Sequence, residues 1–376
     1  MLPEFVLLNP GPANTTASVR KALLVPDICH REPEFYNILR SVRRKLVAVA
    51  GGGDEFAAVV LTGSGTAAVE TAVSSLVRPD GKLLIAENGA YGERIRRMAE
   101  AHGIPFALIR KPVTEAFTPA DIETALAKDA SITHVAVVHH ETTAGVLNPV
   151  AKIGRVTSRR GKILIVDSMS AFAGEPLHVR RDRVDCVISS SNKCVQALPG
   201  LSFIIARRKV LEALGGHPPR SVYLDLFSHW TSQEKDSPLF TPSVPLFFAL
   251  DTALRELLDE GLAARCRRYR DSAMLLRSGM AKLGFHPLVA PRIRTNTMTC
   301  FPLPPGVSYE ELHDALRARG FIVYAGTGSL SKTAFRVANM GTIGRREIQR
   351  FLAALRGILK EMSRKRRGDR VINADD

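Results

Sequence analysis

Apolar runs of four or five residues recur between Ala57 and Arg207, separated by polar turns and by segments of helical period. The runs cover residues 58–61, 82–86, 106–109, 134–138, 163–166, 184–188 and 202–206. Runs of this length with little polar alternation are typical of strands buried on both faces. We therefore predict an α/β fold with a mostly parallel seven-stranded sheet between helices. Ligands bind such sheets at the carboxyl ends of the strands.

The pattern changes after Val210. A Pro-rich, aromatic stretch (217–245) predicts a connection, and helical periodicity over 246–283 predicts a spine helix. Strands at 298–301, 321–324 and 335–338, with a helix at 309–319 and a final helix, predict a small α+β domain. The predicted division is an N-terminal segment that contributes to the active site (1–20), a large domain (21–245), connecting helices (246–285), a small domain (286–362) and a basic tail (363–376).

Composition narrows the class of protein. The chain has 376 residues, 45% of them hydrophobic, and no apolar run approaches the roughly 20 residues that span a bilayer. We expect a soluble protein without a membrane partner. The first eight residues lack the features of a secretory signal, which favours the cytoplasm. Five cysteines without a CxxC pair argue against disulfides and a metal site.

The net charge of +15 attracts anions, and phosphate or phosphonate compounds fit it as well as nucleic acid does. Part of the excess is local, because residues 360–370 hold six basic and two acidic side chains. We interpret that stretch as a solvated helix end and tail, and expect no nucleic-acid partner.

Lys193 follows the run 184–188, and Asp167 closes the run 163–166. A lysine at the mouth of a buried sheet loses its proton readily and attacks an aldehyde, as a Schiff-base enzyme requires. A strand-end aspartate keeps a pyridine nitrogen protonated. Alone, Asp167 reads as a turn cap. With Lys193, it predicts pyridoxal 5′-phosphate as the cofactor.

A Gly-rich turn (residues 62–66) follows the first strand and opens a helix. Its small residues and the Ser64 and Thr66 hydroxyls suit a phosphate group, although an ordinary capped turn is the alternative. It lacks the lysine of a Walker A loop and the GxGxxG spacing. Tyr91, after the second strand, is placed to stack on a heterocycle or simply to pack against a wall.

The stretch 139–145 follows the fourth run and contains two histidines and Glu141. Neighbouring strand residues point to opposite faces, so this trio is poorly arranged for one metal ion. We expect the Thr142 hydroxyl to bond the ring oxygen of the cofactor. Arg336 lies inside an apolar strand, where an unpaired guanidinium is costly. It is predicted to bind a substrate carboxylate or phosphonate.

Several motifs then occur in a recognisable order: Leu-Asn-Pro-Gly-Pro (8–12), Gly-Ser-Gly-Thr (63–66), Asn-Gly-Ala-Tyr-Gly (88–92), His-Glu-Thr-Thr (140–143), Val-Asp-Ser-Met-Ser (166–170), Ser-Ser-Asn-Lys-Cys (190–194) with Pro-Gly (199–200), and Phe-Arg (335–336). In this order they resemble class V aminotransferases of fold type I, and within that family the 2-aminoethylphosphonate:pyruvate transaminases. The match extends from about residue 7 to 359.

The resemblance implies a role for each matching residue. Lys193 would bind the cofactor covalently and carry the transferred proton, and Asp167 would pair with the ring nitrogen. The remaining cofactor-binding positions would be Ser64, Gly65, Thr66, Tyr91, Thr142, Ser190 and, reaching the neighbouring subunit, Thr241. Gly11, Pro12 and Arg336 would contact the substrate. A homodimer with shared active sites follows from the same resemblance.

The implied reaction gives the amine of 2-aminoethylphosphonate to the cofactor and then to pyruvate, forming alanine. His30 and Arg31 lie in a stretch whose sequence differs from that of the degradative enzymes. They either add positive charge near the phosphonate or simply precede a helix starting at Pro33. An alanine:glyoxylate or serine:pyruvate aminotransferase is the nearest alternative. A desulfurase would need a reactive cysteine, with Cys300 the only candidate. A nucleic-acid-binding protein with an inactive fold would not keep Lys193 and Asp167.

Overall fold

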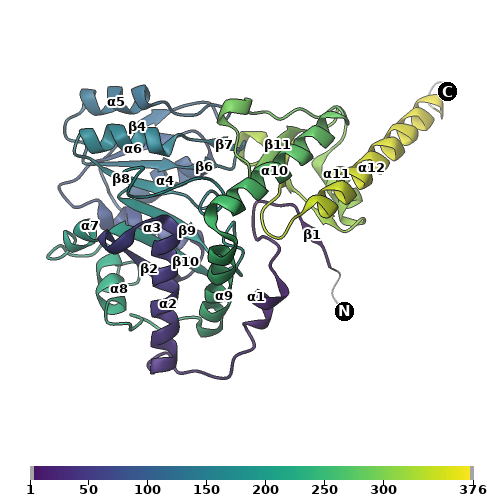
Figure 1. The fold of residues 1–376 in the computed structure, drawn as a ribbon. Helices are drawn as coiled ribbons and strands as arrows, with labels where there is room; N and C mark the ends of the chain where they lie inside the picture. The colour runs from purple at the N-terminus through teal and green to yellow at the C-terminus, as the bar shows by residue number, and fades with distance from the viewer. Residues whose placement is uncertain (1–3, 373–376) are drawn as a thin grey trace.

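The computed structural model describes residues 4–372, and for 365–372 the backbone alone. Within this range the largest sheet has seven strands, and all seven predicted runs lie in it (Figure 1). In sheet order they are β2 (Phe56–Thr62), β10 (Leu201–Arg207), β9 (Cys186–Ser190), β8 (Ile163–Asp167), β5 (His134–Val138), β3 (Leu83–Glu87) and β4 (Phe106–Arg110). β10 is antiparallel to both its neighbours, and the other neighbouring pairs are parallel. The predicted α/β fold is confirmed.

Helices bury both faces of this sheet because alternate strand residues are apolar on each side. Ala58 and Val60 of β2 face one helical layer, whereas Val59 and Leu61 face the other. The first layer contains α2 (Pro33–Ala50), α5 (Pro119–Lys128), α6 (Val150–Arg159) and α9 (Val244–Glu260). The second contains α3 (Gly65–Leu76), α4 (Ala90–Ala101), α7 (Arg208–Glu212) and α8 (Leu226–Gln233).

A second core lies around the C-terminal strands. β11 (Met298–Pro302), β14 (Ala334–Ala338) and β13 (Tyr324–Ala325) form an antiparallel sheet in that order. Its core packs against α10 (Leu262–Ala281), α11 (Tyr309–Arg317) and α12 (Arg345–Ile372). The N-terminal β1 (Val6–Leu7) pairs in parallel with β12 (Phe321–Ile322). The chain therefore starts on this smaller unit before it crosses to the large sheet, with α1 (Ala17–Lys21) beside α9.

Three predicted elements need correction. The strand expected at 321–324 is split, since β12 pairs with β1 and β13 pairs with β14. The single spine helix is two helices, α9 and α10, because Gly261 adopts φ +81° between them. The stretch 217–245 contains α8, which begins with Asp225 as its N-cap.

The remaining short elements are β6 (His140–Glu141), β7 (Val146–Leu147) and 3-10 turns at Gly53–Glu55, Pro291–Ile293 and Gly328–Leu330. The final helix runs through position 363, where the basic tail was predicted to begin, and residues 373–376 of that tail lie outside the described range. Across residues 4–372 no helix is both long enough and apolar enough to span a membrane.

Candidate active site

A cavity of about 490 Å³ lies where the parallel strands of the large sheet end. Its walls come from the Gly-rich turn after β2, the start of α4, the end of β8 and the loop after β9. These segments are far apart in sequence, but the strands that precede them end at the same edge of the sheet. The cavity is lined by seven of the predicted residues: Ser64, Gly65, Thr66, Tyr91, Asp167, Ser190 and Lys193.

Lys193 lies three residues beyond β9, with its amine against the carbonyl of Pro10. Burial lowers the pKa of this amine to about 8, and the nearby positive charges of Arg336 and Arg94 act in the same direction. Gln196, in the same loop, has a left-handed φ of +67° and donates from its side-chain amide to the Tyr269 hydroxyl at 2.6 Å. The loop thus holds a partly deprotonated amine inside the cavity at neutral pH.

Asp167 is the last residue of β8 and is only 4% exposed. Its Oδ1 accepts from the backbone amide of Met169 at 2.9 Å. Burial raises the pKa of this carboxyl to about 6, opposed by that hydrogen bond and by the charges of Arg94 and Lys193. A buried acid of this kind is stabilised as an anion when a cationic ring nitrogen lies beside it.

The Gly-rich turn runs into the N-terminus of α3. Ser64 is the N-cap residue, but its side chain makes no capping hydrogen bond. A Cβ at Gly65 would lie 2.3 Å from the Met169 sulfur, so a larger residue there would have to displace the Met169 side chain. The first-turn amides of α3, together with the Ser64 and Thr66 hydroxyls, form a cradle of neutral donors beside the cavity.

Glu141 positions the wall that carries Tyr91, a role that the sequence argument missed. Its fully buried carboxylate accepts the backbone amides of Tyr91 (3.1 Å) and Gly92 (3.2 Å) at the start of α4. It also accepts the Thr143 amide (3.0 Å) and hydroxyl (2.7 Å). A Cβ at Gly89 would lie 2.4 Å from this carboxyl carbon, so the close approach requires glycine. The sequence signal for this role was an acidic residue directly before Thr142.

The two histidines beside Glu141 turn to separate partners. His139 Nδ1 lies 3.2 Å from the Ser168 hydroxyl, and His140 Nδ1 lies 3.3 Å from the Ser170 carbonyl. Burial lowers the pKa of His139 to about 4 and that of His140 to about 3. Among the described residues no group of three or more His, Cys, Asp or Glu is arranged to hold a metal ion.

Arg336 lies on β14 and is 6% exposed. Its Nε donates to the Ala325 carbonyl at 2.8 Å, and its Nη1 donates to the Thr142 carbonyl at 3.2 Å. These two bonds hold the guanidinium against the loop that contains Thr142. Nη2 and the second hydrogen of Nη1 remain for an anion, because a guanidinium has five N–H donors.

The N-terminal segment closes over the lysine. Gly11 has a φ of +107°, and a Cβ there would lie 2.5 Å from Lys193 Nζ. Its neighbour Pro12 accepts a hydrogen bond from the Asn9 side chain at 3.0 Å. Any larger residue at position 11 would therefore push against the amine.

Seven predicted residues do not line this cavity in the single chain: Gly11, Pro12, His30, Arg31, Thr142, Thr241 and Arg336. Thr241 is exposed, in a segment anchored by a bond from the Ser243 amide to the Thr62 hydroxyl at 3.0 Å. Arg31 is exposed and His30 is half-buried, in the loop before α2. Their predicted roles remain predictions.

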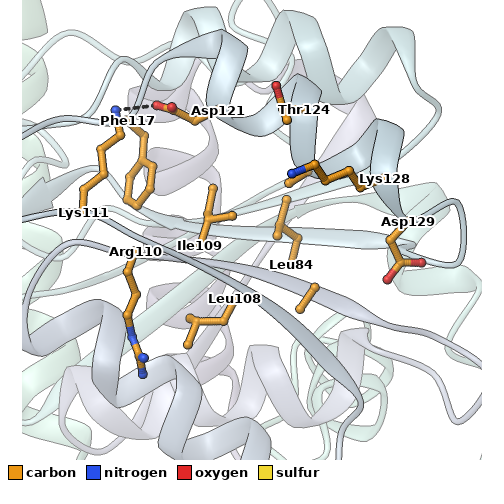
Figure 2. Close-up of a pocket in the computed structure, with 12 residues that line it drawn as sticks. Leu84, Leu108, Ile109, Arg110, Lys111, Phe117, Asp121, Thr124, Lys128 and Asp129 are labelled. Atoms are coloured by element: carbon orange, nitrogen blue, oxygen red, sulfur yellow. Dashed lines mark ion pairs between the residues drawn. The ribbon is translucent and has the colours of Figure 1, made fainter.

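A second cavity, of about 500 Å³, lies along the edge strand β4 beneath α5 (Figure 2). Lys111 and Asp121 form an ion pair of 2.7 Å at one end, and Leu108 and Ile109 contribute an apolar floor. None of the residues that line it is among those predicted to bind cofactor or substrate. The candidate chemistry is therefore at the carboxyl edge of the sheet and not in this groove.

The family model for aminotransferase class-V matches residues 19–347. The chain belongs to the class-V aminotransferase family. Among its relatives, the 2-aminoethylphosphonate--pyruvate transaminase of Syntrophobacter fumaroxidans is 39% identical over 355 residues, which cover 93% of this chain and 95% of that protein. The transaminase of the same name from Vibrio cholerae is also 39% identical, over 93% of this chain and 96% of that protein.

Solved structures of two other aminotransferases have the same fold. Alanine--glyoxylate aminotransferase from Nostoc superposes with a TM-score of 0.89 at 29% identity, covering 96% of both chains. Pyridoxamine-pyruvate aminotransferase from Mesorhizobium loti superposes with a TM-score of 0.90 at 28% identity, covering 100% of this chain and 98% of that one. The predicted family membership is confirmed.

Proposed function

We propose that this class-V aminotransferase uses pyridoxal 5′-phosphate to move an amino group between 2-aminoethylphosphonate and pyruvate, giving phosphonoacetaldehyde and L-alanine in either direction. One observation carries the proposal: Lys193, Asp167 and the Gly-rich turn line a single cavity in a chain 39% identical to transaminases named for that pair of substrates. A lysine amine, a buried acid and a phosphate cradle are the three groups that this cofactor requires.

The residues present fit the cofactor. The Ser64 hydroxyl makes no capping bond, and Gly65 adds no side chain to the turn, which supports phosphate binding there. Tyr91 lines the wall at the start of α4, where its ring can cover a flat heterocycle. Thr142 and Ser190 complete the proposed set around the ring. When bound, pyridoxal phosphate supplies an aldehyde that accepts the amine and a ring that withdraws electrons.

Lys193 and Asp167 have different roles in the proposed reaction. The lowered pKa of Lys193 makes its amine a nucleophile at neutral pH and a base that takes and returns a substrate proton. The Asp167 carboxylate holds a proton on the ring nitrogen by charge pairing, which favours its own ionised form. The Pro10 carbonyl beside Lys193 Nζ keeps the amine directed along the N-terminal loop.

Substrate binding is assigned to Arg336, whose charge acts on Lys193. Its free Nη donors suit a carboxylate or phosphonate, both of which accept two parallel bonds. Gly11 and Pro12 of the N-terminal loop are proposed to border this position. His30 and Arg31 are proposed to add positive charge from the loop before α2.

A homodimer is part of the proposal. Thr241 is exposed, and Phe240 beside it is stacked on Tyr223, with ring centroids 5.2 Å apart. Val222 is 81% exposed and Tyr223 is 45% exposed, so the segment presents apolar surface next to Thr62 at the cavity. If a second copy of the chain covered this surface, Thr241 of one copy would reach the phosphate-binding turn of the other. A cytoplasmic location is proposed with it, supported by five free thiols.

A donor screen tests the function. Purified protein loaded with pyridoxal phosphate is mixed with 2-aminoethylphosphonate, alanine or serine, and the absorbance change of the single half-reaction is followed. We expect the phosphonate and alanine to react, with kcat/KM for serine at least about tenfold lower. Preference for serine over the phosphonate would assign a serine:pyruvate activity instead. Reaction of alanine but not of the phosphonate, with glyoxylate as the acceptor, would assign alanine:glyoxylate exchange.

A further inference from the structure

Arg94 is a cationic residue of the cavity wall that the proposed mechanism does not use. It lies on α4 one turn beyond Tyr91, so both side chains share a face of the helix. Its Nη1 donates to the Thr66 hydroxyl at 3.2 Å, and its guanidinium carbon lies 4.8 Å from the centre of the Tyr91 ring. Arg94 thus touches both the Gly-rich turn and the ring-stacking wall.

Arg94 forms no ion pair with a carboxylate among residues 4–364, whose side chains the structure describes, although its charge acts on Asp167. The neighbouring Arg96, in contrast, pairs with Glu87 at 2.9 Å and Glu100 at 2.7 Å. The Gly-rich turn itself offers only amides and hydroxyls. A phosphate monoester carries nearly two negative charges at neutral pH, which neutral donors alone balance poorly.

The position of Arg94 also separates it from the substrate. Its side chain donates to the Thr66 hydroxyl, and its positive charge opposes the rise in the pKa of Asp167. Arg336, in contrast, contacts the carbonyls of Thr142 and Ala325 on the far segment. The two arginines therefore contact different segments, and Arg94 is the one that contacts the Gly-rich turn.

We propose that Arg94 binds the phosphate group of the cofactor and supplies the positive charge that the Gly-rich turn lacks. The inference rests on the proposed use of pyridoxal phosphate. In binding phosphate, the guanidinium keeps its place over Tyr91 and donates from its remaining Nη hydrogens. It thereby fixes the phosphate and the stacking ring relative to each other.

The test compares two ligands that differ only in the phosphate. Cofactor-free wild type, R94Q, R94K and R97Q are titrated with pyridoxal phosphate and with pyridoxal, and the visible absorbance of the bound ligand gives each Kd. R97Q is the matched control, since Arg97 is an exposed arginine on the same helix that does not line the cavity. Thermal midpoints of the four proteins confirm equal folding.

We expect R94Q to weaken binding of pyridoxal phosphate by about 10- to 100-fold, the range for a charge-assisted bond, and binding of pyridoxal by less than about threefold. The Kd of R94K for pyridoxal phosphate should lie between those of wild type and R94Q, because lysine keeps the charge but cannot donate two parallel hydrogen bonds. R97Q should change neither. Equal losses for both ligands, or pyridoxal phosphate bound within threefold of wild type, would overturn the assignment.

Failure of the proposed function gives a different pattern. If wild type binds neither ligand, the cofactor assignment fails, and the role of Arg94 fails with it. If wild type binds pyridoxal phosphate and R94Q binds it equally well, only the role of Arg94 is overturned.

Discussion

Replacing Glu141 by glutamine tests whether this acid holds the start of α4 in place. The carboxylate has both oxygens fully used: Oε2 accepts two backbone amides from α4, and Oε1 accepts the Thr143 amide and hydroxyl. Burial raises the pKa of Glu141, while these four bonds favour its charged form. Glutamine keeps the shape but turns one acceptor into an NH2 donor.

The magnitude follows from the donors left without an acceptor. If the new NH2 faces α4, two backbone amides lose their acceptor; if it faces Thr143, one backbone amide does, because the hydroxyl can accept instead. Each buried donor without an acceptor costs about 1–3 kcal/mol, so we expect E141Q to lose roughly 1–6 kcal/mol of unfolding free energy. With an unfolding entropy of about 2.1 cal/mol/K per residue, a chain of 376 residues has about 0.8 kcal/mol/K. The thermal midpoint should fall by roughly 1–8 °C.

The assay is calorimetric unfolding of wild type, E141Q and E93Q. Glu93 is the matched control, because it lies in the first turn of the same helix but is exposed, with only a 3.5 Å pair to Arg96. E93Q should unfold within about 1 °C of wild type. If E141Q did the same, the buried carboxylate would not be positioning α4, and the reasoning would be wrong.

Three further predictions concern the cavity. The pKa of Lys193 is lowered to about 8, and only the neutral amine reacts with the cofactor aldehyde. The rate of cofactor binding, followed by stopped-flow absorbance, should therefore rise with pH through about 8. A midpoint above about 9.5 would contradict this. D167N should still bind cofactor but slow the single half-reaction by about 100- to 1,000-fold, since a buried charge is lost; an unchanged rate would refute its role. R336K should raise the Kd of both acidic substrates by about tenfold or more in single-turnover saturation, because lysine lacks the bidentate fork; equal Kd values would remove Arg336 from the substrate site.

The sheet was predictable because its strands are buried on both faces, which leaves continuous apolar runs in the sequence. The direction of each strand was not predictable, since β10 is as apolar as its neighbours β2 and β9 but runs antiparallel to both. The break between α9 and α10 had a signal in Gly261, a residue that commonly interrupts a helix. The split of 321–324 depends on pairing with β1, which no local pattern encodes.

The meeting of Lys193, Asp167 and the Gly-rich turn was predictable, because residues that follow parallel strands gather at one edge. Glu141 was harder, since its partners are backbone amides about fifty positions away. Arg94 had a usable signal in its spacing of three from Tyr91. The place of Thr241 depends on a second chain, so neither the sequence pattern nor a single copy of the fold determines it.

The central claim is that Lys193 forms the covalent link to pyridoxal phosphate. The most direct measurement is reduction of the cofactor-treated protein with borohydride, followed by proteolysis and mass spectrometry of the peptides, with K193A treated in parallel. The account predicts one phosphopyridoxyl group, on Lys193, and none in K193A. A modification on another lysine, or an unmodified peptide around Lys193, would contradict it.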